Sequence, residues 1–186
     1  VDLPNVHLYE TGWPAQYPGN PLRSSAHIYH YISSRLRNDF DKPGILGEAG
    51  YYDTYGGGAL KLTAGNLVLD GEIVANGQSS QTTGWRTGGG SGGAIRLDIG
   101  SLVGGSGGAI KASGGKGEAT YGGGGGGGRI AVYCQTLTLE PTFQMMAAGG
   151  EGANTAYVNN GGAGTVFTKE GTAPGTLRVD NGVLAN

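Results

Sequence analysis

The sequence has little of what many structured proteins rely on. Only one of its 186 residues is cysteine, so no internal disulfide can form. Charged residues make up 14% of the chain and the formal net charge is −2, which leaves no basic surface for nucleic acid. No apolar run approaches the roughly 18 residues that would span a bilayer. The composition therefore argues against nucleic-acid binding and against membrane insertion.

Glycine is what the sequence has in abundance. It accounts for 41 residues, including an uninterrupted run from Gly122 to Gly128. The glycines follow no G-x-y triplet and proline is scarce, which excludes a collagen helix. They cluster between apolar runs, and this clustering is typical of an ordered repeat and not of a uniformly disordered tract.

One short phrase returns along the chain at a nearly fixed spacing. It is a glycine-rich stretch followed by an alternating apolar segment, whose first large apolar residues are Leu60, Ile95, Ile130 and Val166. Their separations of 35, 35 and 36 residues indicate a repeat architecture.

Two further strand-like pieces recur within each repeat. One contains Leu67, Leu102 or Leu137, and the other begins at Ile73, Ile110 or Met146. Residues 177–179 are a shortened fourth copy of the latter piece.

The repeat predicts an all-β fold, a right-handed parallel β-helix (a solenoid) of about four coils with long glycine-rich loops. Equivalent residues of successive coils would then stack. The handedness rests on the general preference of parallel crossovers. An antiparallel sandwich is the alternative, but its turns should recur about every 8–12 residues. The predicted repeats are residues 51–87, 88–121, 122–160 and 161–186.

Period-2 alternation predicts which side chains form the core. It places Ile95, Leu97 and Ile99 inside, with Ile130, Val132 and Cys134 stacked on them. The intervening residues Arg96, Asp98, Ala131 and Tyr133 should face outward.

The first 50 residues lack the repeat and are predicted to be an N-terminal arm and cap. Prolines suggest an extended segment up to about residue 24, and the spacing of Ile28, Ile32 and Leu36 predicts a helix over about 25–38. A strand through residues 27–32 is the rival interpretation. Such a cap would cover the open end of the first coil.

One aromatic residue precedes each repeat phrase at a similar distance. These residues, 9 or 10 positions before Leu60, Ile95, Ile130 and Val166, are Tyr51, Trp85, Tyr121 and Tyr157. Stacked rings could bind the faces of sugars or contact another subunit, or they could simply pack over the glycine loops. Both interpretations remain open at this point.

No constellation of residues points to catalysis, a metal or a cofactor. The carboxylates occupy different columns of the repeat, which argues against a polysaccharide-degrading β-helix enzyme and marks most of them as solvated surface charges. The histidines, His7, His27 and His30, lack a third ligand. Cys134 falls at an inward position and is predicted to be a small buried residue. We therefore expect a non-enzymatic protein.

Five phrases in order, at residues 71–77, 88–95, 126–133, 161–166 and 177–182, support a resemblance. Together they resemble a glycine-rich β-helix-like repeat region of very large secreted or cell-surface proteins of bacteria and some protists. The resemblance implies an extracellular structural or adhesive module. Its expected role is a subunit or segment of a surface fibre, stalk or filament that stacks on itself or on neighbouring domains. Carbohydrate binding through the aromatic residues is the alternative function.

Overall fold

A computed structural model describes residues 54–81, 87–153 and 160–182 of the chain. These residues form eight β-strands and no helix. The predicted N-terminal arm and cap, with the helix at about 25–38 or its rival strand, lie outside the described residues. The strands are β1 (Ala59–Leu69), β2 (Glu72–Val74), β3 (Ala94–Gly104), β4 (Ala109–Lys111), β5 (Arg129–Leu139), β6 (Gln144–Met146), β7 (Thr165–Glu170) and β8 (Thr176–Arg178).

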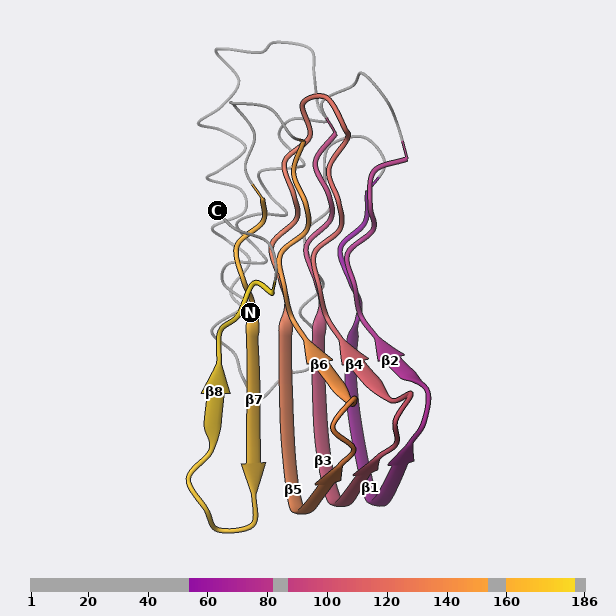
Figure 1. Cartoon of the computed structure of the whole chain (residues 1–186), viewed down its shortest axis with the longest axis vertical. Helices are drawn as coiled ribbons and strands as arrows, with labels where there is room; N and C mark the ends of the chain where they lie inside the picture. The colour runs from indigo at the N-terminus through magenta and orange to yellow at the C-terminus, as the bar shows by residue number, and fades with distance from the viewer. Residues whose placement is uncertain (1–53, 82–86, 154–159, 183–186) are drawn as a thin grey trace, which may run out of the picture.

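The strands form two open sheets. The larger sheet has the order β1-β3-β5-β7-β8, and the smaller has the order β2-β4-β6. All pairings are parallel except that of β7 with β8. Figure 1 shows the long strands side by side, each followed by a sharp turn into its short strand. The glycine-rich segments continue beyond the strands at the opposite end from these turns (Figure 1).

The predicted register of the long strands is confirmed. Leu60 pairs with Ile95, Ile95 with Ile130, and Ile130 with Val166. The second predicted piece is not a separate strand, because it continues the first within strands of 11 residues. The short strands align Ile73, Ile110 and Met145, one residue earlier in the last repeat than predicted.

The apolar core lies between the two sheets. Leu97, Ile130 and Val132 of the long strands are almost fully buried, and they belong to the same cluster as Ile110 and Met145 of the short strands. The predicted alternation is correct, because β3 and β5 alternate between buried and partly exposed residues over their first six positions. Burying each large aliphatic side chain contributes on the order of 1.5–3 kcal/mol.

The prediction of a parallel β-helix is wrong. The described residues form open sheets of five and three strands, neither of which closes or curls on itself, and the larger sheet ends in an antiparallel strand. The segment at 177–179, predicted as a fourth copy of the short strand, instead contributes to β8 beside β7. The spacing of apolar residues specifies which residues pair within a sheet. It does not specify how successive strands are connected, which here depends on glycine segments and on the turn after β7.

The glycine segments pair through their backbones instead of forming loose loops. In each repeat an outgoing segment follows the short strand, and a return segment leads into the next long strand. Gly90 N–H donates to Gln78 O at 2.9 Å, and Gly93 N–H donates to Ala75 O at 2.7 Å, so the two segments run antiparallel. Gly115 N–H then donates to Gly90 O at 2.8 Å, which links one repeat to the next. We call this paired array the glycine layers.

Side chains are excluded from the glycine layers with a period of three. A Cβ atom added at Gly125 would lie 2.0 Å from Gly90 O, and one at Gly127 would lie 2.0 Å from Ala147 O. Gly124 and Gly128 are equally enclosed, but a Cβ atom at Gly126 would meet nothing within 4 Å. A three-residue period matches backbone of the polyproline II type, which makes no internal hydrogen bonds and must bond to neighbouring segments. Close approach of backbones is therefore the reason for the glycines.

Neighbouring glycines should differ sharply in their tolerance of a methyl group. Gly125→Ala places Cβ against the Gly90 carbonyl and should lower the free energy of unfolding by at least 1–3 kcal/mol, as overpacking generally does. Gly126→Ala has free space and should raise that free energy by about 0.4–1 kcal/mol by restricting the unfolded chain. Urea denaturation measures both. Equal effects at the two positions would contradict the packing described here.

Candidate functional site

A group of charged and aromatic side chains lies on the outer face of the larger sheet. It consists of Lys61 of β1, Arg96 and Asp98 of β3, Tyr133 of β5 and Phe167 of β7, and we call it the outer-face cluster. Arg96 Nε donates to both carboxylate oxygens of Asp98 at 3.0 Å, and Lys61 Nζ lies 3.6 Å from Asp98 Oδ2. Alternation along β3 and β5 places these side chains away from the core, as predicted for Arg96, Asp98 and Tyr133.

The outer-face cluster joins all four parallel strands of the larger sheet. The Arg96 guanidinium lies 4.9 Å from the centre of the Tyr133 ring, and the Tyr133 and Phe167 ring centres are 5.5 Å apart. Aromatic pairs of this kind contribute about 0.5–1.5 kcal/mol beyond the burial of area, whereas exposed ion pairs contribute about 0–1 kcal/mol. The cluster is therefore a set of weak ties between successive repeats.

Arg96 and Tyr133 should be energetically coupled. A double-mutant cycle of Arg96→Ala and Tyr133→Ala, measured by urea denaturation, should give a coupling energy of about 0.5–1 kcal/mol, because the cation sits over the ring at a partly exposed site. A cycle with Tyr133→Phe in place of Tyr133→Ala keeps the ring and should give almost no coupling. A coupling that depends on the hydroxyl would contradict the stacking interaction.

A shallow recess lies beside the outer-face cluster. It has a volume of about 470 Å³ and is lined by residues that include Tyr133, Cys134 and Lys169. Cys134 itself is buried, and its S–H group donates to Lys169 O with an Sγ–O distance of 3.8 Å. Burial, and to a lesser degree the charge of Glu170, raise the pKa of the Cys134 thiol. A protonated buried thiol is a poor nucleophile, so Cys134 is the small buried residue that was predicted.

Stability should depend on the ionisation of Cys134. Because the pKa is higher in the folded state, this thiol supports folding fully below the pKa of an unfolded thiol. That contribution is lost as the pH rises through the folded-state pKa. The unfolding free energy of the wild type, relative to that of Cys134→Ala, should therefore decline over this alkaline window. Parallel pH profiles of the two proteins in urea denaturation would contradict this prediction.

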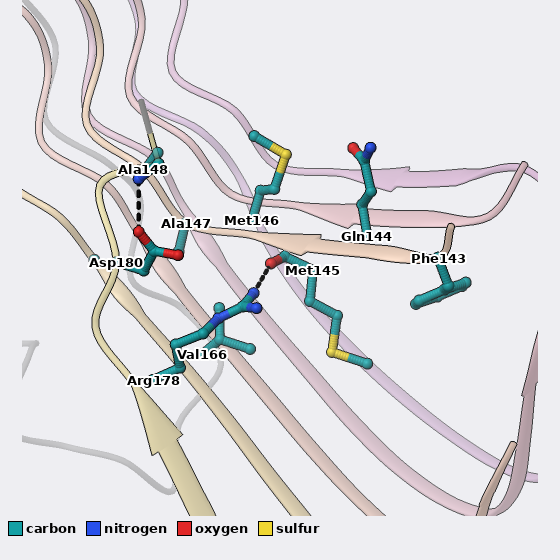
Figure 2. A pocket seen from close by; sticks show the side chains of 11 residues that line it. Phe143, Gln144, Met145, Met146, Ala147, Ala148, Val166, Arg178 and Asp180 are labelled. Carbon is teal, nitrogen blue, oxygen red and sulfur yellow. Dashed lines mark hydrogen bonds between the residues drawn. The ribbon is translucent and has the colours of Figure 1, made fainter. Parts of the chain in front are cut away.

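A second groove, of about 270 Å³, lies at the exposed edge of β6 (Figure 2). Met145 and Phe143 form part of its apolar lining, and Val166 lies on the β7 side. Arg178 of β8 reaches across and donates from its guanidinium to Met145 O. Asp180 lies beside Ala148 in the same view (Figure 2). This groove marks the last of the stacked repeats, and residues 178–182 cover part of it.

The four aromatic residues proposed as a glycan or subunit contact are not brought together in the described part of the chain. Tyr121 alone is described, and it is 49% exposed. Tyr51, Trp85 and Tyr157 lie outside the described residues. The backbone at Tyr121 is held by Glu118, whose carboxylate accepts hydrogen bonds from Thr120 N–H at 2.9 Å and Tyr121 N–H at 2.8 Å.

Glu118 is not a solvated surface charge, which corrects the prediction for this carboxylate. It is only 2% exposed and closes a turn at the end of the glycine layers. Its backbone N–H donates to Thr87 O and its backbone carbonyl accepts from Gly122 N–H, at 2.8 and 2.9 Å. The sequence offers no signal for this burial, because the atoms that enclose Glu118 are mostly backbone.

Within residues 54–81, 87–153 and 160–182, no three histidine, cysteine, aspartate or glutamate side chains are grouped as a metal site would require. The same residues contain no helix that is long and apolar enough to cross a membrane. Comparisons with protein families, with curated proteins and with solved structures found no match to this chain. The resemblance to a glycine-rich repeat region therefore stays a prediction.

Proposed function

We propose that this chain is a non-enzymatic structural module of an extracellular or cell-surface protein. Its role is that of a rigid segment in a fibre or stalk. The observation that carries the proposal is the fixed stacking of the repeats, in which long strands, short strands and glycine layers all pair with their equivalents in the next repeat. A segment of this kind resists bending because every layer is bonded to its neighbours.

The way in which backbone groups are paired supports rigidity over ligand binding. The glycine segments, which would be flexible loops if unpaired, bond within a repeat and between repeats. Gly128 N–H donates to Ala112 O at 2.7 Å and Gly164 N–H donates to Ala147 O at 2.7 Å, as Gly93 N–H does to Ala75 O. Backbone paired in this way opens only with larger-scale unfolding, since local opening requires exposed and weakly contacted bonds.

The charged side chains of the outer-face cluster support the same role. Asp98 is neutralised by Lys61 and Arg96, and Arg96 is also stacked on Tyr133. These groups are already engaged with one another across strands, so a ligand would have to break contacts in order to use them. Carbohydrate binding through the four aromatic residues has Tyr121 alone to support it, and we do not develop it further.

Rigidity along the molecule tests the proposal. Cysteines introduced at two exposed positions, Val68 near the end of β1 and Ala119 at the far end of the glycine layers, provide sites for spin labels. Double electron–electron resonance should give one narrow distance distribution that is unchanged by moderate urea. The buried Cys134 remains unlabelled in the folded protein.

The control is a labelled pair within β1, Val68 and Asn66, which reports the width contributed by the labels alone. A distribution from Val68 to Ala119 much broader than the label contribution would count against a rigid segment. Turnover of a polysaccharide by the purified chain would overturn the non-enzymatic assignment.

A further inference from the structure

The last repeat presents backbone groups that its predecessors use to bond the next repeat. These groups lie along β6 and the outgoing segment 147–150, and on Gly161 of the return segment. We call this surface the terminal layer. The chain does not continue across it as another outgoing segment, because Gly182, at φ 65°, turns away and its N–H donates to Asp180 Oδ1 at 2.8 Å.

One series of hydrogen bonds runs between outgoing segments. Gly77 N–H donates to Ser113 O at 2.8 Å, and Gly114 N–H donates to Ala148 O at 2.9 Å. The equivalent donor of the terminal layer is Gly149 N–H. It donates to the side-chain oxygen of Asn181, Oδ1, at 2.7 Å.

A second series runs from outgoing segments to the return segments before them. Gln78 N–H donates to Tyr55 O, Gly115 N–H to Gly90 O and Gly150 N–H to Gly125 O, at 2.8, 2.8 and 2.7 Å. The equivalent acceptor of the terminal layer is Gly161 O. It accepts from the side-chain nitrogen of Asn181, Nδ2, at 3.0 Å.

The carboxamide of Asn181 thus completes both series with a single group. It places an acceptor and a donor where the next outgoing segment would place a backbone carbonyl and a backbone N–H. Arg178 does the same for the adjacent strand edge, because its guanidinium takes the Met145 carbonyl. The sequence is consistent with this substitution, since Val179-Asp180-Asn181-Gly182 repeats the pattern of Val74-Ala75-Asn76-Gly77 in the first outgoing segment.

We propose that Arg178 and Asn181 form a cap over the terminal layer, and that the surface beneath this cap is a docking surface for a second copy of this chain. Without the cap, Gly149 N–H, Gly161 O and Met145 O would be left without these partners. Unpaired backbone groups at an edge recruit another chain.

The glycine content of the surface selects the occupant. Bonding to the terminal layer in the established series requires a backbone that approaches as closely as Gly115 approaches Gly90, where an added Cβ on Gly125 would lie 2.0 Å from the Gly90 oxygen. A segment with ordinary side chains at these positions cannot approach that closely. Outgoing and return segments of this chain meet the requirement, so a second copy fits the surface. This inference goes beyond the structural role and does not rest on it.

Asn181→Leu in the full chain tests the cap, because leucine keeps the approximate size of the side chain and removes both hydrogen bonds. In dilute solution, hydrogen exchange of the Gly149 amide should become about tenfold faster, the change that corresponds to loss of one hydrogen bond. At higher concentration the variant should dimerise in sedimentation velocity, and protection of Gly149 should return. The wild type should remain monomeric under the same conditions.

Asn66→Leu is the matched control, because Asn66 is exposed on β1 and far from the terminal layer in the repeat order. Unchanged exchange at Gly149 in Asn181→Leu would overturn the cap. Faster exchange in a variant that stays monomeric at every concentration would overturn the docking surface, as would equal association of Asn66→Leu. Association with other added proteins but not with itself would also overturn the choice of a second copy.

A second variant covers the case in which Asn181→Leu fails to fold. Asn181→Asp keeps the acceptor for Gly149 N–H and loses the donor to Gly161 O, so it should associate more weakly than Asn181→Leu while Gly149 stays protected. Loss of protection at Gly149 in this variant would contradict the assigned orientation of the carboxamide. The distance between spin labels at Val68 and Ala119 should be unaffected by either variant, so this proposal and the structural role can fail independently.

Discussion

Hydrogen bonding between glycine backbones is the interaction on which the rest of the structure depends. Each repeat leaves the sheets through one glycine segment and returns through another. The two segments bond to each other and to the repeat before them. Glycine loses more conformational freedom on folding than any other residue, so a single such bond would not hold these segments in place. The array holds because each segment has partners on more than one side.

The two ends of the molecule are therefore stabilised by different physics. At the strand end, apolar side chains such as Leu97 and Ile110 are buried between two sheets. At the glycine end there are almost no side chains to bury, and the close approach of backbones replaces them. Glu118 belongs to this second regime, because a buried carboxylate there is held by the backbone N–H groups of its own turn. The low apolar content of the chain follows from this division.

The stacked arrangement leaves surfaces that differ in what they offer. The outer face of the larger sheet is closed by its own contacts, since Arg96, Asp98 and Tyr133 already engage one another. The terminal layer is closed only by the side chains of Arg178 and Asn181. A carboxamide reproduces one donor and one acceptor of a backbone, which is enough to end the series but not to extend it. These properties suit a rigid segment whose growth is limited at one end.

The sequence by itself determined the register and the core. The spacing of Leu60, Ile95, Ile130 and Val166 specified which strands pair, because stacked strands place equivalent apolar residues over one another. It could not determine how the repeats close, because glycines have no side chains whose pattern reveals their neighbours. Only the tertiary structure placed β8 antiparallel to β7, buried Glu118 and brought Asn181 onto Gly149 and Gly161. These outcomes depend on backbone atoms from distant repeats, which no local pattern of side chains encodes.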